Sequence, residues 1–222
     1  MKKTALVALL GFVALAPAAQ AQVKGIEITP TVGYRFNGSL SGASTYAGGA
    51  YIDSVKVPDS VSYGLSFEYP FHPSMNLEVL WSHQGSKIDV TGKPPNGIYG
   101  TRTVADLSID TIQAGVLWQS GRPRDMVRWY FDFLLGASIL SPKNTTIAMS
   151  SLTRFSGSIG GGAKIYVSDN IGFKLGLRYM PVYINSSDSG YYACDPYWGC
   201  YSYYNTNYLN QFDASAGLII RF

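Results

Sequence analysis

The sequence predicts an all-β fold, namely an eight-stranded antiparallel up-and-down barrel that spans a membrane. Three observations lead to this prediction. An export signal opens the chain, eight later segments alternate apolar and polar residues, and the connections between those segments are alternately short and long. Charged residues make up only 14% of the chain, against about a quarter in typical soluble domains, which leaves little charge for a water-exposed surface.

The first 21 residues have the pattern of a secretory signal peptide. Lys2 and Lys3 precede an apolar run, and the small-residue pattern AQA ends just before Gln22. This run is too short, and is flanked in the wrong way, for a membrane-spanning helix. We therefore expect residues 1–21 to be cleaved and residues 22–222 to form one domain, the barrel. Removing the two lysines lowers the formal net charge from +3 to +1, which gives no reason to expect a nucleic-acid partner.

Period-two alternation is the main evidence for strands, because successive side chains of a strand point to opposite faces. In each of the eight segments one face is apolar and free of charge, and the charged residues fall on the other. No stretch after the signal is long and apolar enough for a transmembrane helix, so a closed barrel is the remaining way to satisfy every backbone group in lipid. The segments are 26–36, 61–69, 75–84, 111–118, 127–140, 154–167, 171–179 and 212–222.

Two places depart from the regular pattern. Leu107 and Ile109 lie in the opposite register to the apolar face of 111–118, and a β-bulge near Asp110 would explain the slip. Pro30 lies inside the first segment and has no N–H to donate to a neighbouring strand, so we expect a bulge or weakened pairing there.

The connections distinguish a membrane barrel from a soluble β-sandwich, whose strands also alternate. Short turns at one end and long loops at the other are typical of outer-membrane barrels, and an even number of strands brings both termini to the periplasm. The short connections are 70–74, 119–126 and 168–170, and the longer ones are 37–60, 85–105, 141–151 and 185–208. Two aromatic girdles are then expected, with Tyr34, Phe36, Trp81 and Tyr179 at the outer rim and Tyr69, Phe71, Trp118, Trp129, Phe173 and Phe222 at the inner rim.

The charged side chains of the strands are expected inside the barrel. Eight strands enclose an interior that side chains can fill, and buried charges are costly unless they are paired, so we expect a filled polar lumen. The alternative is a narrow, weakly anion-favouring pore. Its lining would be Arg35, Arg128, Arg154 and Arg178. The full set of expected lumen charges is Glu27, Arg35, Glu68, Glu78, Arg128, Asp132, Arg154, Lys164, Lys174, Arg178, Asp213 and Arg221.

The chain ends in SAGLIIRF, which resembles the C-terminal signal of bacterial outer-membrane barrels. A polar residue, a glycine, an apolar residue and a terminal aromatic follow at the spacing of that signal, and they are Ser215, Gly217, Ile220 and Phe222. The whole mature chain resembles the small eight-stranded outer-membrane barrels, the group of the OmpA transmembrane domain, OmpX and the opacity-type proteins. This resemblance implies a Gram-negative outer membrane, recognition by periplasmic chaperones and the barrel assembly machinery, and contact with outer-membrane lipids and lipopolysaccharide.

The segment 186–208 carries the sharpest functional signal. Cys194 and Cys200 are the only cysteines, and in an exported protein we expect them to form a disulfide, with a metal or redox pair as the alternative. The aromatic residues here provide rigid contact area with a polar tip. Either they bind a glycan, host or phage surface, or they pack together and order the loop. They are Tyr191, Tyr192, Tyr197, Trp198, Tyr201, Tyr203, Tyr204 and Tyr208.

Signals for catalysis and cofactor binding are weak. Ser82 and His83 are the only candidates for lipid hydrolysis of the kind found in some eight-stranded barrels, but alternation points them to opposite faces. The glycine-rich stretch 157–164 lacks the spacing of a phosphate-binding loop. We expect no enzyme, cofactor or metal site. The expected function is a structural, surface-exposed protein whose extracellular loops contact a glycan or protein ligand. A narrow pore is the second reading, and a lipid-modifying enzyme is the third.

Overall fold

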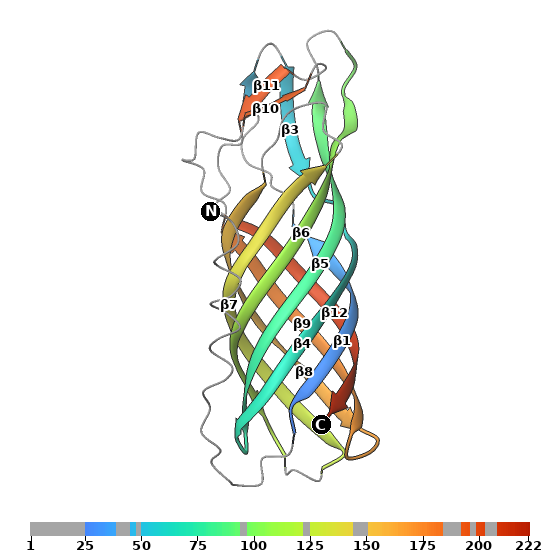
Figure 1. Ribbon diagram of the computed structural model, residues 1–222. Coiled ribbons are helices and arrows are strands. Elements are labelled where there is room, and N and C mark those ends of the chain that lie inside the picture. Colours follow the sequence, from blue (N-terminus) through green and yellow to red (C-terminus); the bar gives the residue numbers. More distant parts are fainter. Residues whose placement is uncertain are drawn as a thin grey trace.

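Eight long strands close into an antiparallel barrel in the computed structural model (Figure 1). The model describes residues 25–38, 45–47, 50–93, 97–121, 125–143, 151–183, 192–195, 199–202 and 208–222. Around the barrel the order is β1, β4, β5, β6, β7, β8, β9 and β12, and β12 pairs with β1 to complete the ring. The barrel strands are β1 (Glu27–Asn37), β4 (Ser60–His72), β5 (Met75–Lys93), β6 (Gly100–Gln119), β7 (Val127–Lys143), β8 (Leu152–Tyr166), β9 (Ile171–Tyr183) and β12 (Tyr208–Arg221). The fold class expected from the sequence is confirmed.

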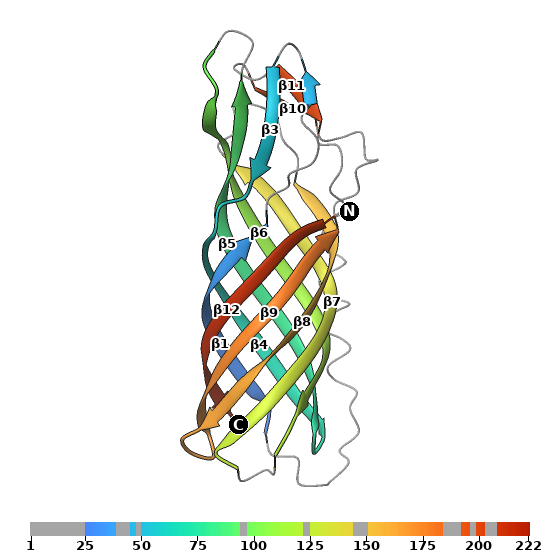
Figure 2. The ribbon, with the colours of Figure 1, turned by 180° about the vertical axis from the view of Figure 1, so that it is seen from behind.

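Four shorter strands lie beyond one end of the barrel, and of these β3 stands beside the end of β5, while the C-terminus lies at the other end (Figures 1 and 2). β3 pairs with β5, and β10 pairs with β11 as a separate hairpin. The signal segment 1–21 lies outside the described residues. The short strands are β2 (Thr45–Ala47), β3 (Ala50–Lys56), β10 (Tyr192–Asp195) and β11 (Gly199–Ser202).

Alternation along each barrel strand separates an outward apolar face from an inward face. Along β7, Phe131 and Phe133 are 47% and 46% exposed, whereas Asp132 between them is 0% exposed. Apolar side chains on the outside and polar ones inside reverse the arrangement of a soluble protein, as a lipid environment requires. No helix in the described part of the chain is long and apolar enough to cross a membrane.

Pro30 weakens the pairing of the strand that closes the barrel, as expected. On the β12 side the pairing passes from Ile28–Ile220 to Thr31–Gly217, so Thr29 and Pro30 have no partners there. The register is the same on both sides of the gap, so there is no bulge. On the β4 side the pairing runs through Pro30 without a break.

The bulge expected near Asp110 is wrong. Pairing of β6 with both neighbours is continuous through Asp110, and Leu107 and Ile109 simply face inward, at 4% and 0% exposure. Their apparent slip arises because the outer part of the interior is apolar, so an inward-facing position there carries a hydrophobic residue. The register shift between β5 and β6 lies nearer the far end of this hairpin, where Val104 is skipped between the pairs Ile88–Ala105 and Asp89–Thr103.

Part of the expected long loop 85–105 is a continuation of the hairpin rather than a loop. β5 and β6 extend to Lys93 and Gly100 and keep pairing. The period-two pattern persists there too, because Ile88 and Val90 are buried at 8% and 0% exposure. β3 pairs with β5 at this end and extends the sheet further.

Candidate functional site

The barrel interior holds three glutamates at one level on adjacent strands. Glu27 on β1 lies opposite Glu68 on β4, and Glu68 lies opposite Glu78 on β5. All three are buried, at 4%, 0% and 0% exposure. We call Glu27, Glu68 and Glu78 the acidic row. Like charges directly opposite each other on neighbouring strands repel, so this row needs cations from elsewhere.

A matching row of cations lies across the lumen. Arg128 on β7 is opposite Lys164 on β8, and Lys164 is opposite Lys174 on β9. We call these three residues the basic row. Around the eight-stranded ring β8 is the fourth strand from β4, and β9 is the fourth from β5. A contact between these strands therefore crosses the full width of the barrel.

The two lysines of the basic row bind the acidic row directly. The Lys164 ammonium donates to Glu27 at 2.8 Å and also to Glu68. The Lys174 ammonium donates to Glu68 and to Glu78, at 2.9 Å each. Lys164 is 0% and Lys174 5% exposed. The ion pairs of Lys164 with Glu68 and of Lys174 with Glu78 thus bridge the lumen between opposite strands.

Further groups extend this network at both ends. At the periplasmic end, Arg221 donates to Glu27 at 2.5 Å and the Tyr166 hydroxyl donates to the same carboxylate at 2.9 Å. The guanidinium of Arg128 lies 4.5 Å from the centre of the Tyr166 ring, a cation–π distance. On the other side, Arg178 donates to Asp132 at 3.1 Å and contacts Glu78 at 3.5 Å.

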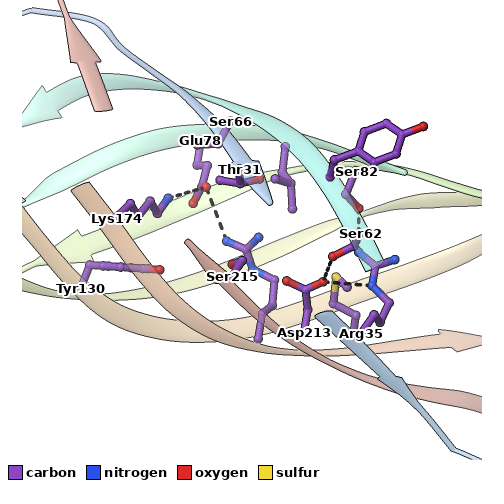
Figure 3. Close-up of a pocket in the computed structure, with 14 residues that line it drawn as sticks. Thr31, Arg35, Ser62, Ser66, Glu78, Ser82, Tyr130, Lys174, Asp213 and Ser215 are labelled. Atoms are coloured by element: carbon purple, nitrogen blue, oxygen red, sulfur yellow. Dashed lines mark hydrogen bonds and ion pairs between the residues drawn. The ribbon is translucent and has the colours of Figure 1, made fainter. Parts of the chain in front are cut away.

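A second polar layer lies toward the outer end and surrounds a small cavity (Figure 3). Arg35 on β1 donates to Asp213 at 3.2 Å and to Ser82 at 3.1 Å, and the Ser62 hydroxyl donates to Asp213 at 2.6 Å. The cavity volume is about 30 Å³, room for one or two water molecules. The cavity lies between this layer and the network of Glu78, Lys174 and Arg178, and side chains of both line it.

Amide and apolar side chains fill the interior above this layer. Gln211 donates to Asn37 at 2.7 Å and to Gln84 at 3.2 Å, and the surrounding inward positions are hydrophobic. Ile109 and Leu209 are at most 1% exposed there, while Leu80 and Met180, also buried, line the cavity itself. The interior thus changes from densely charged at the end near the C-terminus to mainly amide and apolar side chains at the other end, where Arg154 is the inward-facing charge on β8.

All twelve charged residues expected in the lumen point inward, and ten of them are at most 9% exposed. Arg154 and Arg178 are half-buried. The four arginines of the pore alternative do not form one open column. Arg35 and Arg178 are bound to carboxylates, and Arg128 lies against Tyr166.

The C-terminal strand forms the seam of the barrel. Ser215 lies opposite Gly33, Gly217 lies opposite Thr31, and the Phe222 N–H donates to the Ile26 carbonyl at 3.0 Å. The Phe222 side chain is 72% exposed on the outside. Ile220 is outward-facing as well, at 37% exposure. The residues that match the assembly signal therefore lie on the strand that closes the ring.

Much of the aromatic segment 186–208 lies outside the described residues, including Tyr191, Tyr197, Trp198, Tyr203 and Tyr204. For Tyr192 and Tyr201 only the backbone is described. Tyr208 begins β12 and its ring centre lies 5.4 Å from that of Tyr183. In the β10–β11 hairpin Cys194 is the register partner of Cys200, and directly opposed positions are near enough for a disulfide. The disulfide itself stays a prediction.

His83 and Ser82 lie on opposite faces, as their alternation indicates. Ser82 points inward to Arg35, whereas the outward-facing His83 pairs with Asp110 at 2.7 Å between Nδ1 and Oδ1. This outward pair was not predicted from the sequence, because a β-bulge was expected near Asp110. Among the described residues, no group of three or more His, Cys, Asp or Glu side chains could hold a metal ion.

Comparison with known proteins gives the family. The profile of the outer membrane protein beta-barrel domain matches residues 5–218. The chain belongs to this family. It is an outer-membrane β-barrel protein of the Gram-negative type, with its lipid-facing band formed by the outward apolar residues. A sequence comparison with curated proteins gives no significant match.

Solved structures of outer-membrane barrels share the fold. Neisserial surface protein A matches with 16% identity over 89% of this chain and 97% of its own, with a TM-score of 0.54. OprG from Pseudomonas aeruginosa matches with 13% identity over 90% of this chain and 97% of its own, with a TM-score of 0.50. AlkL, studied in lipid bilayers, matches with 12% identity over 93% of this chain and 95% of its own, with a TM-score of 0.54. At this level of identity the likeness concerns the fold alone.

Proposed function

We propose that this protein is a non-conducting, surface-exposed barrel that anchors an extracellular contact surface in the outer membrane. The observation that carries the proposal is the pair of buried ion pairs that cross the interior. Lys164 and Lys174 bind carboxylates on the opposite side of the ring. A solute would have to break these buried ion pairs to pass, and breaking one costs about 3–5 kcal/mol.

The extracellular end is the part of the barrel that remains for contact with partners. There β5 and β6 rise above the barrel as one hairpin, β3 pairs with β5, and the β10–β11 hairpin lies at the same end of the molecule (Figure 1). The segment 186–208 is rich in Tyr and Trp, residues that favour binding surfaces because they combine rigidity with a polar tip. We assign it contact with an extracellular glycan or protein, held in shape by a Cys194–Cys200 disulfide.

The barrel assembly machinery and periplasmic chaperones are the partners we propose during biogenesis, with Ser215, Gly217, Ile220 and Phe222 as the signal that is read. Lipids and lipopolysaccharide are the partners of the mature barrel. Catalysis and cofactor binding have no place in this function. The nearest serine to the outward His83–Asp110 pair donates to Asp110 at 3.5 Å rather than to the imidazole, so the geometry of an activated nucleophile is absent from this described pair.

Deletion or exchange of 186–208 tests the contact function. We expect the variant to insert normally, to retain its heat-modifiable migration, and to lose binding of cells to glycan or host-surface arrays. Exchange of the periplasmic turn 168–170 is the matched control and should leave binding intact. If binding is unchanged in a folded loop variant while a knockout leaks periplasmic contents, the role is purely structural and the contact proposal is wrong.

A further inference from the structure

One side of the barrel differs from the others at its outer end. Four lysines project from the outward face of the wall formed by β3, β5, β6 and β7, and all are exposed. We call this set the lysine wall, and it consists of Lys56, Lys87, Lys93 and Lys143. On the outer ends of β8, β9, β12 and β1, by contrast, the described outward residues carry no charge. They are Thr153, Phe155, Tyr179, Pro181, Tyr183, Tyr208, Asn210, Phe212, Tyr34 and Phe36.

Strand register places the lysines close together. Lys87 on β5 and Lys143 on β7 both lie opposite Asp106 on β6, one on each side. Lys56 on β3 lies opposite Asp89, two residues along β5 from Lys87. Strands are about 4.8 Å apart, so Lys87 and Lys143 project from backbones roughly 10 Å apart.

The four lysines and the aspartates of the same wall differ in whether their charged groups have bonding partners. Asp89 accepts a hydrogen bond from Thr103 at 2.6 Å, and Asp110 accepts from His83 at 2.7 Å. Asp106 is engaged as well. Within the described ranges, none of the four lysines has a hydrogen-bond or ion-pair partner. The wall therefore presents free cations and half-buried, satisfied carboxylates.

The wall continues downward into the lipid-facing band. Below the row of Lys87, Asp106 and Lys143 come small residues, with Gly85 opposite Ser108 and Ser108 opposite Ser141. A Cβ at Gly85 would meet nothing within 4 Å, so the row is open at Gly85, whereas Ser108 beside it is buried at 6% exposure. We call the open surface at Gly85 the shelf.

Beneath the shelf the outward face becomes aromatic and then apolar. Tyr63, His83 and Asp110 share one row, and the ring centres of Tyr63 and His83 are 4.8 Å apart. The next row begins the apolar surface with Trp81 opposite Ile112. Aromatic rings of this kind lie at headgroup depth. The lysines lie at least four residues farther out along the strands than this aromatic row, and therefore on its aqueous side.

We propose that the lysine wall binds the phosphate-bearing headgroup of an outer-leaflet glycolipid. The phosphates lie between Lys56, Lys87 and Lys143, the sugar rests on the shelf at Gly85, and the acyl chains run down over Trp81 and Ile112. A soluble anion would not need the continuity between the charged rows and the apolar band. The lipid is thus held on one side of the barrel only, and this orients the extracellular hairpin relative to the membrane.

Native mass spectrometry of the full-length protein, titrated in mild detergent, tests this proposal. The probes are phosphorylated lipid A, its dephosphorylated form and phosphatidylcholine. Wild type should bind the phosphorylated form selectively. Each basic side chain at an anionic membrane surface is worth about a fivefold gain in affinity. The triple variant Lys56→Gln, Lys87→Gln, Lys143→Gln should therefore bind about a hundredfold more weakly.

Two variants keep the test specific. Arg102→Gln removes a positive charge from the same hairpin, but Arg102 is opposite the inward-facing Val90 and so lies on the other face. It should bind like wild type. Replacing the three lysines with arginine preserves charge and should preserve binding. Tryptophan fluorescence and heat-modifiable migration check that each variant is folded.

Several results would overturn the proposal. They are equal binding of dephosphorylated lipid A, unchanged binding by the triple glutamine variant, or an equal loss in Arg102→Gln. Displacement of the glycolipid by an equal concentration of inorganic phosphate would instead make the wall a soluble-anion site and would refute the lipid assignment. None of these measurements involves 186–208, so failure here is separate from failure of the proposed contact function.

Discussion

Neutralising Glu68 is the most informative perturbation of the barrel interior. This carboxylate is the centre of the acidic row, is 0% exposed, and accepts from Lys164, Lys174 and Asn76. The substitution Glu68→Gln keeps its size and removes its charge. Because the two lysines then lose a shared counter-charge inside the barrel, we expect the free energy of unfolding to fall.

The size of the loss follows from the geometry. At 2.9 Å and an effective dielectric constant near 20, one ion pair is worth about 6 kcal/mol. Glu68 makes two such contacts. Its register partners Glu27 and Glu78 lie about 5 Å away across the ladder and each repel it by about 3 kcal/mol. The net loss is about 4–5 kcal/mol, which is within the usual range for breaking a buried pair.

Equilibrium urea unfolding in lipid vesicles, followed by tryptophan fluorescence, measures this loss. The double variant Glu68→Gln, Lys174→Met should recover part of it, because the surplus cation is removed together with its partner. With vesicles of phosphatidylcholine alone, which lack the proposed glycolipid, Lys143→Gln on the outward face of β7 is the control and should leave the unfolding midpoint unchanged. A loss below about 1 kcal/mol for Glu68→Gln, with no recovery in the double variant, would refute the argument that the facing rows hold the interior together.

Four further predictions concern other parts of the chain. Deleting Phe222 removes the last backbone hydrogen bond of the seam, to Ile26, so outer-membrane assembly should fall in cells, and normal insertion would contradict this. Gly162→Ala should lower the free energy of unfolding by about 3 kcal/mol, because the new Cβ would lie 1.9 Å from the Leu175 carbonyl oxygen. Gly85→Ala should leave it unchanged, since its Cβ would meet nothing within 4 Å. Equal urea midpoints for the two variants would count against this packing argument. The hydrogen bond from Tyr99 to Asp53 raises the pKa of Tyr99 above its ordinary value, so this bond is present at neutral pH and is lost as the pH rises through the raised pKa. Asp53→Asn should lower the pKa of Tyr99 in an NMR titration, and an unchanged pKa in this variant would contradict the assignment of the shift to Asp53. Intact mass after alkylation without reductant should show Cys194 and Cys200 unmodified, and two added alkyl groups would exclude the disulfide.

The barrel and its two faces could be predicted because a period of two is a local property of the chain. Phe131, Asp132 and Phe133 alternate in the sequence and alternate in space. The number of strands and the inward direction of the charges follow from the same pattern. The effect of Pro30 could be anticipated as well, since the absence of an N–H has a direct consequence for the ladder.

The pairing of the charges could not be predicted, because it depends on register across the barrel. Nothing local indicates that Glu27, Glu68 and Glu78 share one level or that Lys164 and Lys174 face them. The bulge expected near Asp110 was wrong for another reason, which is the composition of the barrel interior. Leu107 and Ile109 looked out of phase only on the assumption that all inward positions are polar, and the interior turns apolar toward its outer end. The pair of His83 with Asp110 was not predicted because a bulge was expected at Asp110.

Conductance in a planar lipid bilayer tests the central claim, that the interior is closed, most directly. Purified full-length protein is added to a membrane under an applied voltage, and insertion is verified independently by heat-modifiable migration. Ion pairs that cross the lumen and a residual cavity of about 30 Å³ predict a flat baseline with no steady current steps. Steady nanosiemens steps that scale with the amount of inserted protein would contradict the closed interior and would favour the narrow pore.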